Sequence, residues 1–323
     1  MVRPEFAVLF LFAACAAAPE DTKGEAVPEV AKHEQEMRDG EARRRDFQAV
    51  LVRLDQAMDS YVQALANRGQ VRADQQAERL ERTLRETVLD IGPVSNRGAG
   101  PAPGENFGRL QAAAANGKEK HQQAIAVAAL GFSGQTSMLD LILQGALSDD
   151  PLLIDRAVLG LAVLKAPDTP PGVLAAIVER PTHPEDGRVQ AAWALYEIQA
   201  RSNRVPEIVE IWRRFLTAGR DTLPAGVIVS AVRGLGLARD AANAELVVSF
   251  LKHSTPRVRM AAAVALARMN AQSHADDLIE LLGPAETVQN VRLHARKALA
   301  DLAGGRDVGY DVAAWRKVFD RGQ

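Results

Sequence analysis

The sequence is poor in residues that usually carry chemistry. It has one cysteine, Cys15, in 323 residues, so it can form neither an internal disulfide nor a cysteine-based zinc site. Aromatic residues make up only 5%, and much of the 47% hydrophobic share is alanine, leucine and valine, which favours closely packed helices. Lysine and arginine (39) nearly balance aspartate and glutamate (41), so a net charge of −2 predicts no binding of nucleic acid.

Catalytic motifs are also missing from the sequence. No two of its six histidines lie at i,i+4 spacing, and no zinc-protease, Walker, dinucleotide or nucleophile-elbow motif is present. The one His-Glu pair, His33-Glu34, lies outside the regular part of the chain described below. The sequence therefore predicts no catalytic residue, no cofactor and no metal site.

The sequence has no apolar run of the 18 to 20 residues that cross a membrane, but its N-terminus carries a shorter one. Arg3 precedes an apolar segment at 6–14, as in an export signal. The stretch LFAAC, ending at Cys15, resembles a bacterial lipobox. That resemblance implies a signal peptide over 1–15, cleavage before Cys15, lipid on its thiol, and a membrane anchor at the cell envelope.

Two other interpretations of the N-terminus stay open. Ordinary signal peptidase cleaves after small-x-small triplets such as Ala14-Cys15-Ala16, which would leave a soluble periplasmic protein. Alternatively, the chain is cytoplasmic and the run is only a hydrophobic start. We expect export, with lipid anchoring as the leading form.

Beyond the signal, residues 16–40 lack apolar periodicity and are predicted to be a flexible tether. Residues 41–91 are predicted to form an antiparallel helical hairpin, because two apolar stripes at helical spacing flank Asn67-Arg68-Gly69-Gln70. Two helices alone are marginally stable, so we expect the hairpin to dock on the rest of the chain, on a second copy, or on a partner. The stripes consist of Phe47, Leu51, Leu54, Met58, Tyr61, Leu65 and of Ala77, Leu80, Leu84, Val88, Ile91.

A glycine- and proline-rich linker is predicted over 92–107, and self-similar segments follow it at 108–303. Alanine or glycine precedes a leucine in motifs such as AVAAL (126–130) and AAVAL (262–266). The recurring leucines are separated by 31, 34, 40, 31 and 33 residues. A helical period of this length predicts an all-α solenoid of about six helix pairs. The leucines are Leu130, Leu161, Leu195, Leu235, Leu266 and Leu299.

The segments PRVRMAAAVAL (256–266) and VRLHARKAL (291–299) resemble HEAT repeats in their valine-arginine pair, alanines and leucine. In that family the arginine often joins a polar ladder between repeats. The resemblance therefore implies structural roles for Arg259 and Arg292. Two groups of HEAT enzymes are disfavoured, because bilin lyases act in the cytoplasm and DNA glycosylases need a cationic groove.

The last segment, 304–323, is predicted to be a capping helix that closes the repeats, with Asp311 as its N-cap. Val312, Trp315 and Phe319 share one face of this helix, and a ligand-binding aromatic pair is the alternative interpretation. Trp193, Trp212 and Trp315 are expected to be core residues.

Function is predicted from the fold class rather than from a site. Solenoids offer extended surfaces, so we expect a non-enzymatic scaffold or adaptor that binds another protein at the cell envelope. The alternatives are a lyase-like HEAT enzyme or enzyme subunit, and a structural envelope protein that self-associates through 41–91. Acidic residues on the second helix of each pair are candidates for the partner surface: Glu207, Glu210, Asp276, Asp277 and Glu280.

Overall fold

The structure, a computed structural model, describes residues 29–66, 71–91 and 104–320. All regular structure in these ranges is helical, with fifteen α-helices and no strand. The chain divides into two compact units, Met1–Asp46 and Phe47–Gln323. The fold is an all-α solenoid, as the sequence predicts. Cys15 and the predicted signal peptide lie outside the described residues, as do the turn at 67–70 and most of the linker.

The first unit contains the polar start of α1 (Glu29–Ala66), which begins inside the segment 16–40 that we predicted to be a tether. Residues 31–39 are all exposed, so no apolar stripe reveals this part of the helix in the sequence. Helix-favouring residues and contacts one turn apart account for it, because the Gln35 amide donates to Asp39 (2.9 Å) and Arg38 pairs with Glu34 (3.8 Å).

The second unit opens with the remainder of α1 and with α2 (Val71–Leu89), the two helices of the predicted hairpin. Most residues of the two apolar stripes are buried here, but Ile91 lies beyond the end of α2 and is 63% exposed. The chain leaves the helix at Asp90, whose φ of 54° is left-handed, and this directs Ile91 away from the stripe. The buried members are Leu51, Leu54, Met58, Tyr61, Ala77, Leu84 and Val88.

This hairpin packs on the first helices of the repeat region. Helix α2 contacts α3 (Glu105–Asn116) and α4 (Lys120–Gly131), and the ring of Tyr61 meets Phe132 edge to face at 5.3 Å. Arg156 forms ion pairs with Asp55 (2.7 Å) and Asp59 (3.0 Å) of α1. The apolar stripes are therefore covered by the chain's own repeats.

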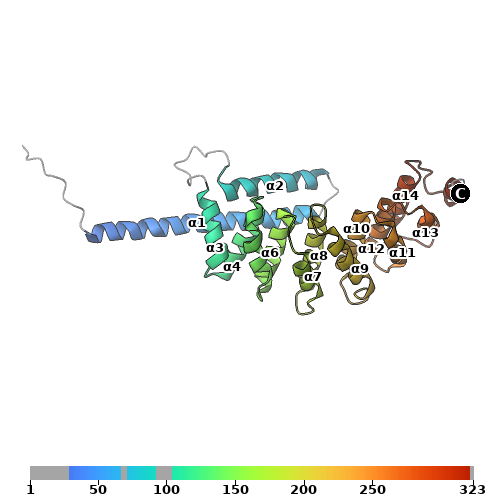
Figure 1. The fold of residues 1–323 in the computed structure, drawn as a ribbon. Helices are drawn as coiled ribbons and strands as arrows, with labels where there is room; N and C mark the ends of the chain where they lie inside the picture. The colour runs from blue at the N-terminus through green and yellow to red at the C-terminus, as the bar shows by residue number, and fades with distance from the viewer. Residues whose placement is uncertain (1–28, 67–70, 92–103, 321–323) are drawn as a thin grey trace, which may run out of the picture. The chain divides into compact units, whose positions relative to one another are not determined.

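The repeats follow one another in chain order, as Figure 1 shows for α3 to α14. Each first helix contacts the first helix of the next pair, and from α6 onward it also contacts the shorter second helix that precedes it in the chain. The first helices are α4, α6 (Pro151–Leu164), α8 (Glu185–Gln199), α10 (Ala225–Ala238), α12 (Pro256–Arg268) and α14 (Gln289–Leu302). The second helices are α5 (Leu139–Ala146), α7 (Pro171–Glu179), α9 (Val205–Thr217), α11 (Ala244–Val248) and α13 (Ala275–Glu280).

Small residues let the first helices approach closely. A Cβ atom on Gly131 would lie 2.4 Å from the backbone oxygen of Gly160, so α4 and α6 are in direct backbone contact there. Proline is the first residue of α6, α7 and α12, where its missing N–H is no loss. These local signals fix where each helix begins and how near its neighbour lies.

The 40-residue spacing between Leu195 and Leu235 is explained by α9, whose 13 residues make it the longest of the second helices. A buried amide ties this repeat together. The Trp212 indole N–H donates to Gln199 Oε1 (2.8 Å), and Gln199 Nε2 donates to the Gly234 carbonyl (2.9 Å). All polar groups of this contact are thereby satisfied without water.

The chain closes with α15 (Val312–Asp320), which packs against α13. Asp311 accepts a hydrogen bond from the Ala314 N–H (3.0 Å), as expected of an N-cap. Trp315 is fully buried and donates to the Gly309 carbonyl (2.9 Å), so it serves the core.

Candidate functional site

The most distinctive hollow of the second unit is an apolar groove of about 510 Å³ beside the first helices of the repeats. It lies between the C-terminal end of α1 and the helices α6, α8, α10 and α12. We call it the groove. Its lining consists of Val62, Leu65, Ala66, Leu159, Val189, Gln190, Trp193, Ala225, Gly226, Val229, Ser230, Arg233, Thr255 and Arg257.

Part of the groove's lining comes from the first turn of α10, which carries almost no side chain. Ala225 and Gly226 lie there, and Val189 of α8 packs directly on Gly226, where a Cβ atom would approach it to 2.7 Å. The hollow that Ala225 and Gly226 line is open to solvent. Trp193 and Val229 form its walls and are only partly buried.

Trp193 differs from the other two tryptophans, which we expected to resemble it. Trp212 and Trp315 are fully buried, as predicted for core residues, whereas Trp193 lines the groove and stays partly exposed. Val62 on the facing wall is 37% exposed. A large apolar ring beside an exposed valine is typical of a surface that a partner covers.

The other end of the groove is cationic. Arg233 on α10 and Arg257 on α12 line it, and among the described residues no aspartate or glutamate does. Arg268 is exposed on α12 and donates to the Tyr196 hydroxyl at 3.5 Å. Within the described residues, none of these three arginines has a carboxylate within ion-pair distance. This arginine trio therefore carries positive charge without a counterion.

The charges of Arg257 and Arg268 act on Arg233. Its side chain is exposed, yet the walls of the groove surround it, and this partial burial is the main cause that lowers the pKa of its guanidinium. The positive charges of Arg257 and Arg268 also lower the pKa, and only Tyr196 opposes them. The cationic form of Arg233 is thus less favoured here than in water.

A second hollow, of about 400 Å³, differs from the groove because its basic side chains pair with carboxylates. Arg259 donates to both carboxylate oxygens of Glu286 (2.7 and 2.9 Å), and Lys252 pairs with Glu280 (3.5 Å). The Thr255 N–H donates to Nδ1 of His253 (3.0 Å). Such a network links neighbouring repeats and leaves few groups free for a ligand.

His253 in this hollow is held neutral by its surroundings. Burial is the first cause that lowers the pKa of its imidazole, and the charges of Arg220 and Arg259 lower it further, against Asp221. The neutral ring accepts at Nδ1 and stacks on Phe250 at 6.2 Å. It therefore acts as a fixed part of the connection before α12.

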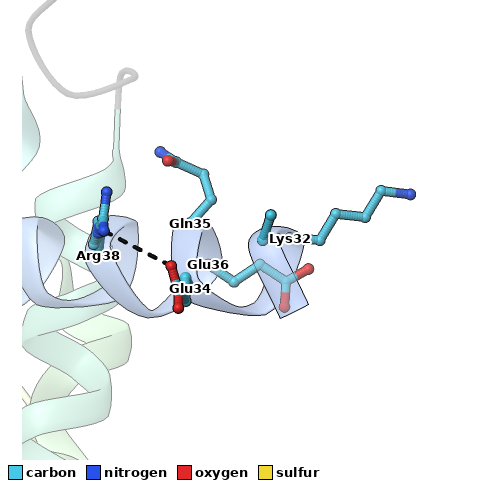
Figure 2. A pocket seen from close by; sticks show the side chains of 6 residues that line it. Lys32, Glu34, Gln35, Glu36 and Arg38 are labelled. Carbon is cyan, nitrogen blue, oxygen red and sulfur yellow. Dashed lines mark ion pairs between the residues drawn. The ribbon is translucent and has the colours of Figure 1, made fainter. Parts of the chain in front are cut away.

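Two other hollows are open surfaces without convergent groups. One, in the first unit, is flanked only by exposed residues of α1, and Figure 2 shows Lys32, Gln35 and the Arg38–Glu34 pair spread along one helix. The other, of about 580 Å³, lies where the end of α14 and α15 meet the start of α13. Neither brings together side chains for chemistry.

The structure places the predicted ladder arginines between repeats. Arg259 of α12 reaches Glu286, which precedes α14, and also donates to the His253 carbonyl (2.8 Å). Arg292 of α14 donates to the Leu282 carbonyl (3.0 Å) and lies 5.4 Å from the ring of Tyr310. Arg188 of α8 repeats this geometry on the Val178 carbonyl (2.7 Å).

The predicted acidic candidates do not form one surface. Asp277 and Glu280 line the second hollow, and Asp276 lines the hollow beside α15. Glu207 and Glu210 of α9 pair with Arg204 (3.5 Å) and with Arg213 on the same helix. None of the five lines the groove, because they lie on second helices and the groove is formed by first helices.

The described residues contain no group of three or more histidine, cysteine, aspartate or glutamate side chains able to hold a metal ion. Over the same ranges, no helix combines the length and apolarity needed to cross a membrane.

Comparison with known proteins supports the fold. Residues 220–300 match the family model of HEAT repeats. No curated protein matches the sequence. An engineered protein of known crystal structure is 19% identical, covers 61% of this chain and 97% of its own, and has a TM-score of 0.44. The complex of CpcE and CpcF of phycocyanin lyase from Nostoc sp. PCC7120 is 14% identical, with 96% and 99% coverage and a TM-score of 0.36. Because both TM-scores lie below 0.5, neither likeness bears on activity.

The groove was missed in the sequence because its apolar residues have the same spacing as the core. A signal for its cationic end was nevertheless present. Arg233, Arg257 and Arg268 have no aspartate or glutamate three or four residues away, where helical ion pairs form. Arginines with no local counterion, on helices that stack side by side, point to a shared positive surface.

Proposed function

We propose that the protein is a non-enzymatic scaffold that binds another protein in the groove. The observation that carries this proposal is the pair of partly exposed apolar side chains, Trp193 of α8 and Val62 of α1, that line the groove. Burying such a surface against a partner would contribute roughly 25 cal/mol for each Å² removed from water. Partly buried aromatic side chains at the centre of a patch are the usual anchors of protein interfaces.

Site-specific crosslinking tests this function. A photoreactive phenylalanine analogue replaces Val62 in the full chain, and the matched control carries it at Arg201, which is exposed and outside the groove. Irradiation of cells should give a discrete adduct with a second protein at Val62 and none at Arg201. No adduct at Val62, or the same adducts at both positions, would contradict the proposal.

We further propose that the scaffold is exported and held at the cell envelope by lipid on Cys15. The support is the lipobox-like stretch that ends at this residue. Each buried methylene of an acyl chain contributes about 0.8 kcal/mol to membrane binding, so two or more chains give a stable anchor. Cys15→Ala should abolish labelling by radioactive palmitate and release the protein from the membrane fraction. Unlabelled wild type would contradict lipidation and leave ordinary signal cleavage or a cytoplasmic chain as the alternatives.

A further inference from the structure

The groove changes character from one helix to the next. Val62, Leu159 and Trp193 lie on α1, α6 and α8, α10 carries both Val229 and Arg233, and Arg257 lies on α12. Because these first helices stack in chain order, the groove runs from an apolar end to a cationic end. A ligand that fits it must show the complementary change along its length.

The cationic end differs from those arginines of the repeats that have carboxylate partners. Arg156, Arg214, Arg259 and Arg296 each form an ion pair. In the arginine trio, by contrast, Arg257 and Arg268 lie near enough to Arg233 to repel its charge, and this repulsion opposes folding. An arrangement that costs stability and leaves donors free is what an anion-binding surface requires.

The dimensions indicate the size of the ligand. Packed helices lie ~8–10 Å apart, so the step from α8 across α10 to α12 is roughly 20 Å. An α-helix rises ~1.5 Å per residue, so a helical segment of about 13 residues spans that distance. Helix-in-groove recognition commonly uses apolar anchors at i, i+3, i+4 and i+7, which match a groove of this width.

We propose that the groove binds an acidic amphipathic helix of a partner protein, with its apolar residues on Trp193 and Val62 and its carboxylates on Arg233 and Arg257. This inference rests on the proposed scaffold function and specifies the chemistry of the partner. Arginine suits this role because its planar guanidinium can hold a carboxylate with two parallel hydrogen bonds. Nucleic acid fits poorly, since the other half of the groove is apolar and the whole chain has a net charge of −2.

Peptide selection tests the proposal. A displayed library of 16-residue helical peptides, randomised on one face, is selected against the full chain. Enriched peptides should carry leucine or aromatic anchors followed by aspartate or glutamate. Their binding should weaken at least about tenfold for the double variant Arg233→Glu and Arg257→Glu, as expected when charged hydrogen bonds are lost. Binding should also weaken as salt is added.

The matched control is the double variant Arg201→Glu and Lys297→Glu, which makes the same change of charge at exposed positions outside the groove. Circular dichroism and the thermal midpoint of both double variants show that each is folded. Intrinsic fluorescence gives a local readout, because Trp193 is the one partly exposed tryptophan in the described residues. Peptide binding should shift the emission, and Trp193→Phe should remove the shift.

Two other outcomes would contradict the proposal. Peptides that crosslink in the groove but lack acidic residues, and are indifferent to the charge reversal, would overturn this inference and leave the scaffold function standing. Failure to enrich any groove-binding peptide, together with tight binding of oleate, would overturn both, since the ligand would then be a small amphipathic carboxylate.

Discussion

The repeat stack and the α1–α2 hairpin bury similar apolar side chains, yet they make different kinds of contact with neighbouring helices. Between repeats, backbones touch at glycines such as Gly131 and Gly160, and polar contacts are regular. The hairpin instead uses side chains from distant parts of the chain, as in the Arg156 pairs with Asp55 and Asp59. The difference shows that a repeat interface is set by residue size, whereas a docked element depends on specific long-range pairs.

The sharpest way to break the repeat interface is to add one methyl group. Gly131→Ala puts its Cβ atom 2.4 Å from the Gly160 oxygen, and backbone atoms cannot move aside without separating α4 from α6. We expect a loss of about 3 kcal/mol or more in the free energy of unfolding, at the upper end for overpacking. Urea unfolding followed by circular dichroism measures it.

Gly172→Ala is the matched control, because nothing lies within 4 Å of the added Cβ atom in α7. This variant should gain about 0.5–1 kcal/mol, since alanine loses less backbone freedom than glycine in a helix. Equal unfolding midpoints for the two variants would mean that the first helices are not in close contact.

The polar ladder between repeats is tested by Glu286→Gln. Burial alone would raise the pKa of the Glu286 carboxyl, but hydrogen bonds from Arg259 and the Val288 N–H, with the charge of Arg259, lower it below its usual range. A lowered carboxyl pKa stabilises the fold at neutral pH, and this contribution disappears as the pH falls through that pKa.

The Glu286→Gln variant should therefore be less stable than wild type by about 2–3 kcal/mol at pH 7, the range for a hydrogen-bonded charge that is nearly buried. The two should converge as the pH drops below about 4, near the ordinary carboxyl pKa. Unfolding midpoints across this pH range measure the difference. A gap that stays constant with pH would show that the Arg259 pair does not act through the charge of Glu286.

The hairpin contact is tested by Arg156→Ala, which removes the ion pairs to Asp55 and Asp59. The arginine side chain is only 16% exposed, so we expect a loss of about 1–2 kcal/mol. Hydrogen exchange should quicken in α1 and α2 and stay unchanged over 220–300, because the hairpin can open without the repeats.

Arg214→Ala is the control for this prediction. Its pair with Glu179 is exposed, at 50% and 43%, and should contribute less than about 1 kcal/mol. If faster exchange in Arg156→Ala extends through the whole repeat region, the hairpin and the stack unfold as one cooperative element, and the comparison above would not hold.

The same contrast explains which parts of the structure could be predicted from the sequence. The helix pairs were predictable because the spacing of Leu130, Leu161 and later leucines repeats a local pattern. The start of α1 was not, since its residues are polar on all sides, and the Arg156 pairs were not, since no local pattern links residues so far apart. The groove was missed because Trp193 and Val62 have core spacing but meet no neighbour that covers them fully.

The smallest effect is expected at the junction of the hairpin with the repeats, where Asp90 at the end of α2 accepts hydrogen bonds from the backbone and side chain of Asn106. Burial is the main cause that raises the pKa of the Asp90 carboxyl, and the charge of Glu105 adds to it; the hydrogen bonds from Asn106 and the charge of Arg109 oppose this. A raised carboxyl pKa means that the ionised form costs stability at neutral pH and that the cost vanishes as the pH falls through that pKa.

Asp90→Asn removes the charge, and once the Asn106 side-chain amide turns by about 180° the new amide can donate to Asn106 Oδ1, which is buried without a hydrogen-bond partner in the wild type. The variant should therefore be more stable than wild type at pH 7, by about 0.5 kcal/mol or less, and the gain should shrink as the pH falls. Asp301→Asn, at an exposed position on α14, controls for the loss of one charge and should change nothing. A less stable Asp90→Asn at pH 7 would show that the ionised carboxylate holds Asn106 more strongly than burial opposes it, so the hairpin junction would then depend on charge as the repeat ladder does.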